Sequence, residues 1–185
     1  MKKSTIIFKS VLAAFAFFAS AALVSCEKTD DNDDDKKGDE NKPAYVSFTY
    51  RNIESADLLK YCDVVIEYTD ADGKKNDTIT AETWEKNFLT KLPCTYSFKT
   101  YYTMKADIDY TAEDTLHVGR NNYGYVYTLL TANGDIISTT DPVIKFQPYA
   151  IKLNKLAELV LQGKFDRGND FVFDADGKFN HAVIK

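Results

Sequence analysis

Residues 92–105 of this 185-residue chain, LPCTYSFKTYYTMK, alternate between two kinds of side chain. One set is mostly apolar and comprises Leu92, Cys94, Tyr96, Phe98, Thr100, Tyr102 and Met104. The other set is mostly polar and comprises Thr95, Ser97, Lys99, Tyr101, Thr103 and Lys105. Because successive side chains of a strand point to opposite faces, this pattern predicts a long β-strand with one face in a core and one in solvent.

The same alternation recurs on both sides of this stretch. Strands are predicted at residues 44–50, 61–69, 77–80, 83–89, 106–110, 123–131, 135–139, 143–147, 169–174 and 178–184. Between such runs lie Asp72-Gly73, Asn133-Gly134 and Asp176-Gly177. These dipeptides supply the positive φ that tight turns require, so we expect three hairpins.

One helix is expected among the strands, at about residues 152–162. Apolar residues recur there at helical spacing, namely Leu153, Leu156, Ala157 and Val160. Asn154 is a candidate cap and Gly163 the expected stop, and a shorter helical turn is expected at residues 55–60. The predicted fold class is therefore mainly β, an antiparallel immunoglobulin-like β-sandwich of about eight or nine strands over residues 44–185, with the helix covering one edge or end.

The N-terminal 26 residues follow the pattern of a secretory signal. Lys2 and Lys3 are positively charged, residues 11–24 are apolar or small, and Ser25 precedes Cys26. The apolar stretch is shorter than the roughly 20 residues that a membrane-spanning helix needs. We therefore expect residues 1–25 to be removed as a signal peptide.

The end of this segment, Leu23-Val24-Ser25-Cys26, resembles a bacterial lipobox. At such a motif the cysteine thiol is acylated by chains such as palmitate, and the cysteine becomes the new N-terminus. Each buried methylene contributes about 0.8 kcal/mol of membrane affinity, so several chains would anchor the protein stably. The alternative is an ordinary secretory signal with a chance cysteine.

Residues 26–43 are predicted to be the lipidated Cys26 and a disordered acidic tether. Residues 27–40 contain eight acidic, three basic and no apolar side chains, too little apolar surface to support folding. The acidic block at residues 30–35 resembles the surface-export signal of Bacteroidota lipoproteins. The resemblance implies an outer-membrane, lipid-anchored protein at the cell surface, and a periplasm-facing anchor is the alternative.

Four further stretches and one tryptophan carry a second resemblance. They are LLKY at residues 58–61, VVIEYTDADGK at 64–74, Trp84, KLP at 91–93 and FVFDADG at 171–177. Together they are similar to small Bacteroidota surface lipoproteins with an immunoglobulin-like sandwich. The resemblance implies the fold and the membrane address, but it assigns no activity to particular residues.

Catalytic and cofactor-binding patterns are nearly absent from the sequence. The histidines are His117 and His181, and there is no nucleophile elbow, zinc-protease motif, phosphate loop or Cys-x-x-Cys. A nucleophile pair of His117 with Cys62 or Cys94 has little support, because both cysteines lie on inward strand faces. We expect no enzyme, no cofactor and, with a net charge of −5 and no basic stripe, no nucleic-acid partner.

Two cysteines remain after Cys26 is acylated. Cys62 and Cys94 both belong to inward sets of predicted strands, so a disulfide could join them. The alternative is two buried free thiols that pack as small apolar groups.

A cluster of oxygen-bearing side chains raises the question of Ca²⁺ near the C-terminus. It comprises Asp166, Asn169, Asp170, Asp174 and Asp176. Its spacing matches no calcium loop, and a hairpin turn accounts for the last two members. We therefore predict no metal site.

Aromatic residues are the remaining candidates for ligand contacts. An exposed row of tyrosine and tryptophan can stack on sugar rings or anchor a protein. The candidates are Trp84, Tyr101, Tyr123, Tyr125 and Tyr127. The alternative is structural, since aromatic rows at a period of two commonly pack within sheets.

Two functions are compatible with these patterns. The first is a non-catalytic surface binding module that captures a glycan or another nutrient. The second is a structural or interaction subunit of a surface protein assembly. An exposed aromatic row would favour the first, and a long unpaired edge strand or an apolar patch would favour the second.

Overall fold

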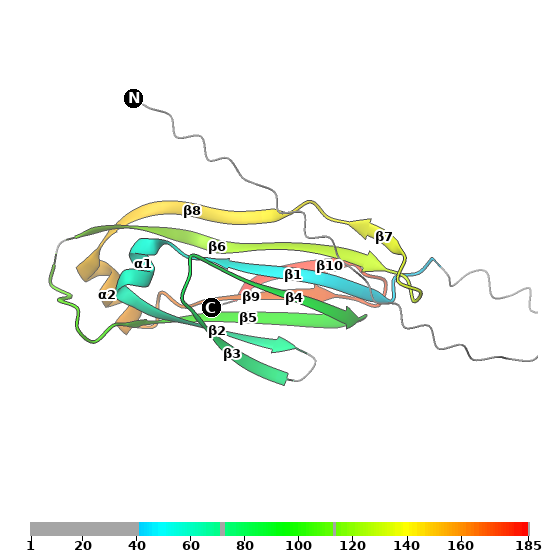
Figure 1. The fold of residues 1–185 in the computed structure, drawn as a ribbon, viewed down its shortest axis with the longest axis horizontal. Helices are drawn as coiled ribbons and strands as arrows, with labels where there is room; N and C mark the ends of the chain where they lie inside the picture. Colours follow the sequence, from blue (N-terminus) through cyan, green and yellow to red (C-terminus); the bar gives the residue numbers. More distant parts are fainter. Residues whose placement is uncertain (1–40, 71–72, 113, 185) are drawn as a thin grey trace, which may run out of the picture. The chain divides into compact units, whose positions relative to one another are not determined.

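The computed structural model describes residues 41–70, 73–112 and 114–184 and contains two antiparallel sheets packed as a sandwich (Figure 1). Sheet A comprises β1 (Tyr45–Ile53), β4 (Thr83–Lys91), β6 (Thr115–Leu130), β7 (Ile136–Thr139) and β8 (Val143–Lys152). Sheet B comprises β2 (Cys62–Asp70), β3 (Gly73–Ile79), β5 (Cys94–Met104), β9 (Arg167–Phe173) and β10 (Phe179–Ile184). The predicted mainly β sandwich is confirmed.

The strand order explains which strands are central. Sheet A runs β4-β1-β6, and both β7 and β8 pair with the far side of β6. Sheet B runs β10-β9-β5-β2-β3. The predicted long strand is β5, at the centre of sheet B, and its burial alternates as expected from Tyr96 to Met104.

Aromatic stacking between β1 and β5 forms the middle of the core. The Phe48 ring stacks on Tyr96 with centroids 4.7 Å apart, and Tyr50 stacks on Phe98 at 3.8 Å. Phe171 of β9 lies 5.0 Å from Phe48. Such pairs contribute about 0.5–1.5 kcal/mol each beyond the burial of their area, so they hold the two sheets in a defined register.

Two short helices lie at the same end of the sandwich (Figure 1). Helix α1 (Ala56–Tyr61) starts at Ser55, whose hydroxyl accepts a hydrogen bond from the Leu58 N–H at 3.2 Å. Helix α2 (Leu153–Leu161) buries the four apolar residues predicted for it. The chain then turns at Gly163, where φ is 64°. The expected cap at Asn154 is wrong, because the helix already starts at Leu153 and Asn154 lies inside its first turn.

The three predicted hairpins are confirmed. They join β2 to β3, β6 to β7 and β9 to β10. The turn glycines Gly73, Gly134 and Gly177 have φ values of 107°, 88° and 77°. These positive values are the left-handed conformations that glycine adopts without strain.

Two strand predictions require correction. Residues 106–110 form turns and irregular backbone, where the Tyr110 hydroxyl donates to the Lys105 carbonyl at 2.6 Å. This segment lies in the connection from sheet B to sheet A, so it has no neighbouring strand to pair with. In contrast, β6 begins at Thr115 rather than near Tyr123, because its first half pairs with β8 across a register shift between Arg120 and Tyr123.

The predicted signal peptide, the acylated Cys26 and the tether up to residue 40 lie outside the described residues. They remain predictions.

Candidate functional site

The predicted aromatic row of β6 faces the other sheet. The Tyr125 ring lies 5.2 Å from Phe171, and the Tyr127 ring lies 4.9 Å from Phe173. Tyr123 is only 7% exposed. The three tyrosines are therefore inter-sheet packing contacts, as the structural interpretation of the row expected.

The other two candidate aromatics lie on different faces. Trp84 of β4 is half-buried between the sheets, and its Nε1 donates to Asp77 Oδ2 at 3.2 Å. Tyr101 of β5 is 40% exposed and belongs to the outward set of sheet B, opposite Val65. The five candidate aromatics thus form no common binding face.

The disulfide that the sequence allowed between Cys62 and Cys94 is not formed, since both cysteines are free. Cys62 pairs with Met104 at the last residue of β5, and Cys94 is the first residue of that strand. Ten residues of strand separate these positions by about 33 Å, whereas a bridge requires Cα atoms within about 7 Å. Burial raises the pKa of the Cys62 thiol to about 12, with smaller effects of nearby charges, so this thiol is a packing group.

The His117 side chain lies at the surface of β6, whereas Cys62 is buried and Cys94 is partly buried. Its side chain is 75% exposed and lies 3.7 Å from Asp57 Oδ2. The two cysteines belong to inward strand positions, so the considered Cys–His nucleophile pair is not formed.

The carboxylates of Asp166, Asp170 and Asp174 accept hydrogen bonds from different groups and do not converge on one point. Asp174 Oδ1 accepts from the N–H groups of Asp176 and Lys178 at 2.9 and 2.8 Å, which shapes the hairpin turn. Asp166 Oδ1 accepts from the Tyr102 N–H at 3.1 Å, and Asp170 accepts from a serine hydroxyl. Within the described part of the chain, no group of three or more acidic, histidine or cysteine side chains is arranged to hold a metal ion.

The first candidate site is the β8 edge, which we define as residues 143–148. Among the described strands, β8 pairs with β6 alone, and it lies at the border of sheet A (Figure 1). Ile144 pairs with Gly124, which lies between two inward tyrosines of β6, so Ile144 points outward. Ile144 is 53% and Phe146 38% exposed, and Pro148 is exposed as well.

Two further features shape this edge. Phe146 lies across Gly119 so closely that a Cβ atom there would overlap its ring, so the glycine permits this placement. The short strand β7 continues the same side of β6 and adds Ile136 and Ile137, which are 71% and 40% exposed. On β8 itself, the apolar residues Ile144, Phe146 and Pro148 are exposed and two residues apart along the strand.

The second candidate site is a buried polar cluster around Glu54, at the end of β1. Glu54 is 2% exposed, and its Oε1 accepts from Asn52 Nδ2, Asn122 Nδ2 and the Tyr102 hydroxyl at 2.8, 2.6 and 2.7 Å. Its second oxygen, Oε2, is buried and has no hydrogen-bond partner among the described residues. Burial raises the pKa of the Glu54 carboxyl, while the charge of Arg167 and the three hydrogen bonds oppose that effect.

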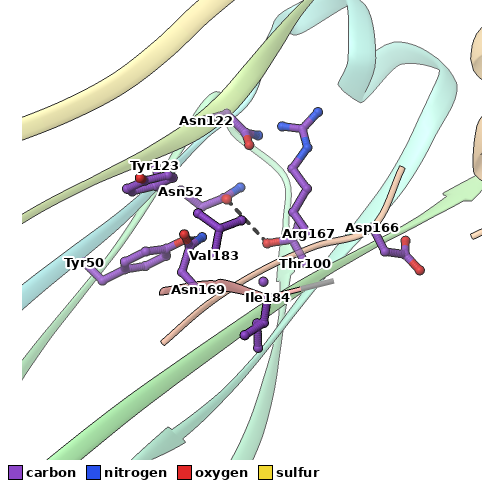
Figure 2. Close-up of a pocket in the computed structure, with 11 residues that line it drawn as sticks. Tyr50, Asn52, Thr100, Asn122, Tyr123, Asp166, Arg167, Asn169, Val183 and Ile184 are labelled. Carbon is purple, nitrogen blue, oxygen red and sulfur yellow. Dashed lines mark hydrogen bonds between the residues drawn. The ribbon is translucent and has the colours of Figure 1, made fainter. Parts of the chain in front are cut away.

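Arg167 of β9 completes the cluster. Its guanidinium lies over the rings of Phe165 and Tyr102, with its carbon 4.6 and 5.4 Å from the two ring centroids. Its Nη1 is buried, and the described part of the chain offers it no hydrogen-bond partner. Arg167 and Asn122 are also among the residues that line a recess of about 100 Å³. Figure 2 shows these lining side chains in close-up. The cluster therefore holds two polar atoms, Glu54 Oε2 and Arg167 Nη1, that are buried and have no hydrogen-bond partner among the described residues.

The residues of this cluster were not among the sequence candidates. Glu54 lies in a predicted loop, and Arg167 is more than a hundred residues away along the chain, so no local motif joins them. One feature of the sequence could have indicated the cluster. Asn52 and Thr100 occupy inward positions of otherwise apolar strands, and polar residues at such positions indicate a buried hydrogen-bond network.

The chain matches no protein-family model, no curated protein and no solved structure. The structure therefore establishes a mainly β domain of two sheets. The resemblance to Bacteroidota lipoproteins remains a prediction from the sequence. None of the helices in the described residues has the length and apolar character to cross a membrane.

Proposed function

We propose that this protein is a non-catalytic interaction module, held at the outer membrane through a lipid on Cys26 and displayed at the cell surface. Its β8 edge would bind an extended segment of a partner protein in a surface assembly. The observation that carries this proposal is the β8 edge, which pairs with no described strand other than β6 and carries outward apolar residues. The predicted lipobox and acidic tether support the location.

An open strand edge is a template for pairing with another strand. Its outward N–H and C=O groups can extend the sheet, and side chains at alternate positions then select the added segment. Pro148 supports the assignment of β8 as an edge, because proline cannot donate a ladder hydrogen bond and occurs in sheets mainly at edges. The exposed Ile144 and Phe146 supply apolar contacts for such a segment.

Charge favours an acidic partner segment over a second copy of this chain. Residues 143–152 contain two lysines and no acidic residue. Antiparallel pairing of two copies of β8 would bring together strands of the same positive charge, which disfavours it. We therefore infer a partner segment with apolar residues at alternate positions and acidic residues between or beside them.

Capture of glycans on an aromatic platform has less support. The tyrosines that would form the platform contact the core of sheet B, and Tyr101 alone among the five candidates lies on an outer face. A single exposed ring gives little area for stacking.

The edge can be tested by site-specific photo-crosslinking in intact cells that make the full chain. A photoreactive residue at position 144 or 147 is expected to crosslink one partner, whose crosslinked peptide is extended and acidic with alternating apolar residues. Asn76, on the exposed edge strand β3, is the control position and is expected to give no such product.

A charge change tests the mechanism of binding. Phe146→Asp removes an apolar contact and repels an acidic segment, so the crosslinking yield at position 144 is expected to fall about tenfold or more. Asn76→Asp adds the same charge at the other edge and is expected to leave the yield unchanged. Self-crosslinked product, or equal yields from β3 and β8, would overturn the proposal.

The location has its own test. Cys26→Ala is expected to release the protein from the membrane fraction, and protease added to intact cells is expected to digest the wild-type protein. If the variant stays attached, the lipobox interpretation is wrong.

A further inference from the structure

The hydrogen bonds between β6 and β8 determine which backbone groups of β8 face its open side. At one end of the pair, the Leu153 N–H donates to the Asp114 carbonyl at 2.9 Å, one step beyond the last residue pair of the register. Bonded and non-bonded residue pairs alternate along an antiparallel ladder. Counted in steps of two from that bond, Gln147 is bonded to β6 and Pro148 is not. The proline, which has no N–H, thus stands where β6 needs no donor.

The other end of β8 shows the same alternation. The Thr140 N–H donates to the Tyr127 carbonyl at 3.0 Å, so Tyr127 turns its backbone groups to this side of β6. Tyr125, two residues before, does the same and therefore bonds Val143. The odd-numbered residues of β8 bond β6 at both ends, and the even-numbered residues face away from it.

Ile144 and Phe146 therefore direct both their N–H and C=O groups to the open side of β8, where no strand of the described residues lies. Pro148 directs only a C=O group there, because proline has no N–H. A further strand thus finds a complete ladder at Ile144 and Phe146 that loses a bond at Pro148. This length fits a partner segment of about five residues.

The inward side chains near this open side are exposed. Lys145 pairs with the inward Tyr123, so it points toward the gap between the two sheets, and yet it is exposed. In the other sheet, Val183 of β10 pairs with the buried Asn169 and is 64% exposed. The gap between β8 and β10 is therefore open to solvent at these positions.

The opposite border of the sandwich is closed by a tryptophan. The Trp84 ring of β4 lies 5.4 Å from the Tyr68 ring of sheet B, and its Nε1 donates to Asp77 of β3. These contacts join the two sheets at that border, whereas the inward Lys145 stays exposed at the border of β8. The β8 border is thus the one with room for an added strand.

The sequences that border the open gap carry positive charge. Residues 143–152 and 178–184 contain three lysines and no acidic residue. Burial, and then the charge of Lys145, lower the pKa of the His181 imidazole on β10, so this positive charge acts across the gap. Opposite charges on directly facing residues of two strands stabilise their pairing. A partner side chain that faces Lys145 is therefore expected to be acidic.

We propose that the partner segment adds to β8 as an antiparallel strand in one defined phase, with apolar residues opposite Ile144 and Phe146 and an acidic residue opposite Lys145. This inference rests on the function proposed above and specifies its partner. Every described strand pair of the two sheets is antiparallel, so such a strand continues sheet A in its own pattern. The apolar residues then share hydrogen bonds with β8, and the acidic residue lies in a non-bonded pair, where side chains are closest.

N-methylated peptides test this phase. The probe is a seven-residue peptide of alternating valine and aspartate, added to the full chain in detergent micelles. Saturable downfield shifts of the Ile144 and Phe146 amide protons are expected, with little change at Lys145, whose N–H bonds β6. Methylation of the aspartate N–H groups, which point away from β8, is expected to leave binding unchanged. Methylation of the valine N–H groups removes bonds to β8 and is expected to weaken binding about tenfold or more.

A charge reversal tests the acidic position. Lys145→Glu is expected to weaken binding of the unmodified peptide about fivefold or more, because an attractive cross-strand pair becomes repulsive. The same variant is expected to bind a valine–lysine peptide more tightly than the wild type does. Lys91→Glu is the matched control, since Lys91 is exposed on β4 at the other edge of sheet A, and it is expected to bind as the wild type does.

The inference is overturned if methylation of the aspartates weakens binding more than methylation of the valines, since the acidic residues would then bond β8. It is also overturned if no peptide gives saturable shifts, or if Lys145→Glu and Lys91→Glu bind equally well. The proposed function survives these results if crosslinking in cells still finds one partner at position 144 or 147. A failed crosslinking experiment beside phase-specific peptide binding would instead refute the function in a surface assembly and leave the strand preference of β8 intact.

Discussion

Replacement of Tyr125 by alanine separates the two interpretations of the tyrosine row. The ring of Tyr125 has five ring neighbours with centroids 5.2–6.5 Å away, namely Phe48, Tyr123, Phe171, Phe179 and His181. If the row were a sugar platform, the variant would fold normally and lose only ligand. If the row is inter-sheet packing, the variant loses stability.

The expected size follows from these contacts. Truncation of a fully buried aromatic residue to alanine costs about 3–5 kcal/mol. Tyr125 is only partly buried, so we expect a loss of about 2–3 kcal/mol in the free energy of unfolding. For a domain of this size, each kcal/mol lowers Tm by about 2–4 °C, which gives a fall of about 4–12 °C.

Urea unfolding followed by tryptophan fluorescence is a suitable assay. Trp84 is the single tryptophan, and its ring lies 5.4 Å from that of Tyr68 in the opposite sheet, so its emission reports on separation of the sandwich. Tyr101→Ala is the matched control. Tyr101 is 40% exposed and has no stacked ring among the described aromatic pairs, so its loss is expected to stay below about 1 kcal/mol.

The reasoning is refuted if Tyr125→Ala costs no more than Tyr101→Ala. Such a result would mean that β6 does not present this residue to sheet B. A one-residue shift of strand register would be the physical cause, since it moves every side chain to the opposite face.

Three further predictions concern pH, thiols and turns. Because burial raises the pKa of Glu54, the folded protein binds more protons than the unfolded chain between the ordinary value near 4.5 and the raised value, so stability falls as pH rises through that window. Glu54→Gln is expected to flatten this fall in urea titrations at a series of pH values, and parallel profiles would contradict it. Peptide mapping without reductant is expected to find Cys62 and Cys94 unlinked, with Cys94 alkylated first because it is less buried; a linked peptide would disprove the strand placement. Gly177→Ala is expected to cost more than about 1 kcal/mol, since φ is 77° and a Cβ would lie 2.9 Å from a neighbouring side chain, whereas Gly134→Ala has open space and is expected to cost less, as thermal unfolding can show.

Local patterns predicted the parts of the fold that depend on local physics. The alternation of β5, the helix α2 and the positive φ of Gly134 each follow from a few neighbouring residues. The prediction of a strand at residues 106–110 was wrong because local patterns do not show whether a partner strand is available. Its residues suit a strand, but a strand needs a partner, and the connection between the sheets offers none.

The candidate sites depended on contacts between distant residues. The clustering of Asn52, Glu54 and Arg167 requires β1 and β9 to face each other across the sandwich, which no spacing along the chain encodes. The exposure of Phe146 likewise depends on β8 having one neighbour instead of two. Sequence alternation predicts that a strand has two faces, but it cannot predict whether a strand lies at an edge.

By itself, then, the amino-acid order determined the sandwich class, the hairpin turns and the second helix, and it predicts a lipid anchor at Cys26. These features arise from side-chain periodicity, backbone φ preferences and short motifs, all of which act over a few residues. Only the tertiary structure decided that the tyrosine row is core, that Cys62 and Cys94 lie apart, and that a polar recess and an open edge exist. Those outcomes depend on strand order and register, which result from the packing of the whole chain.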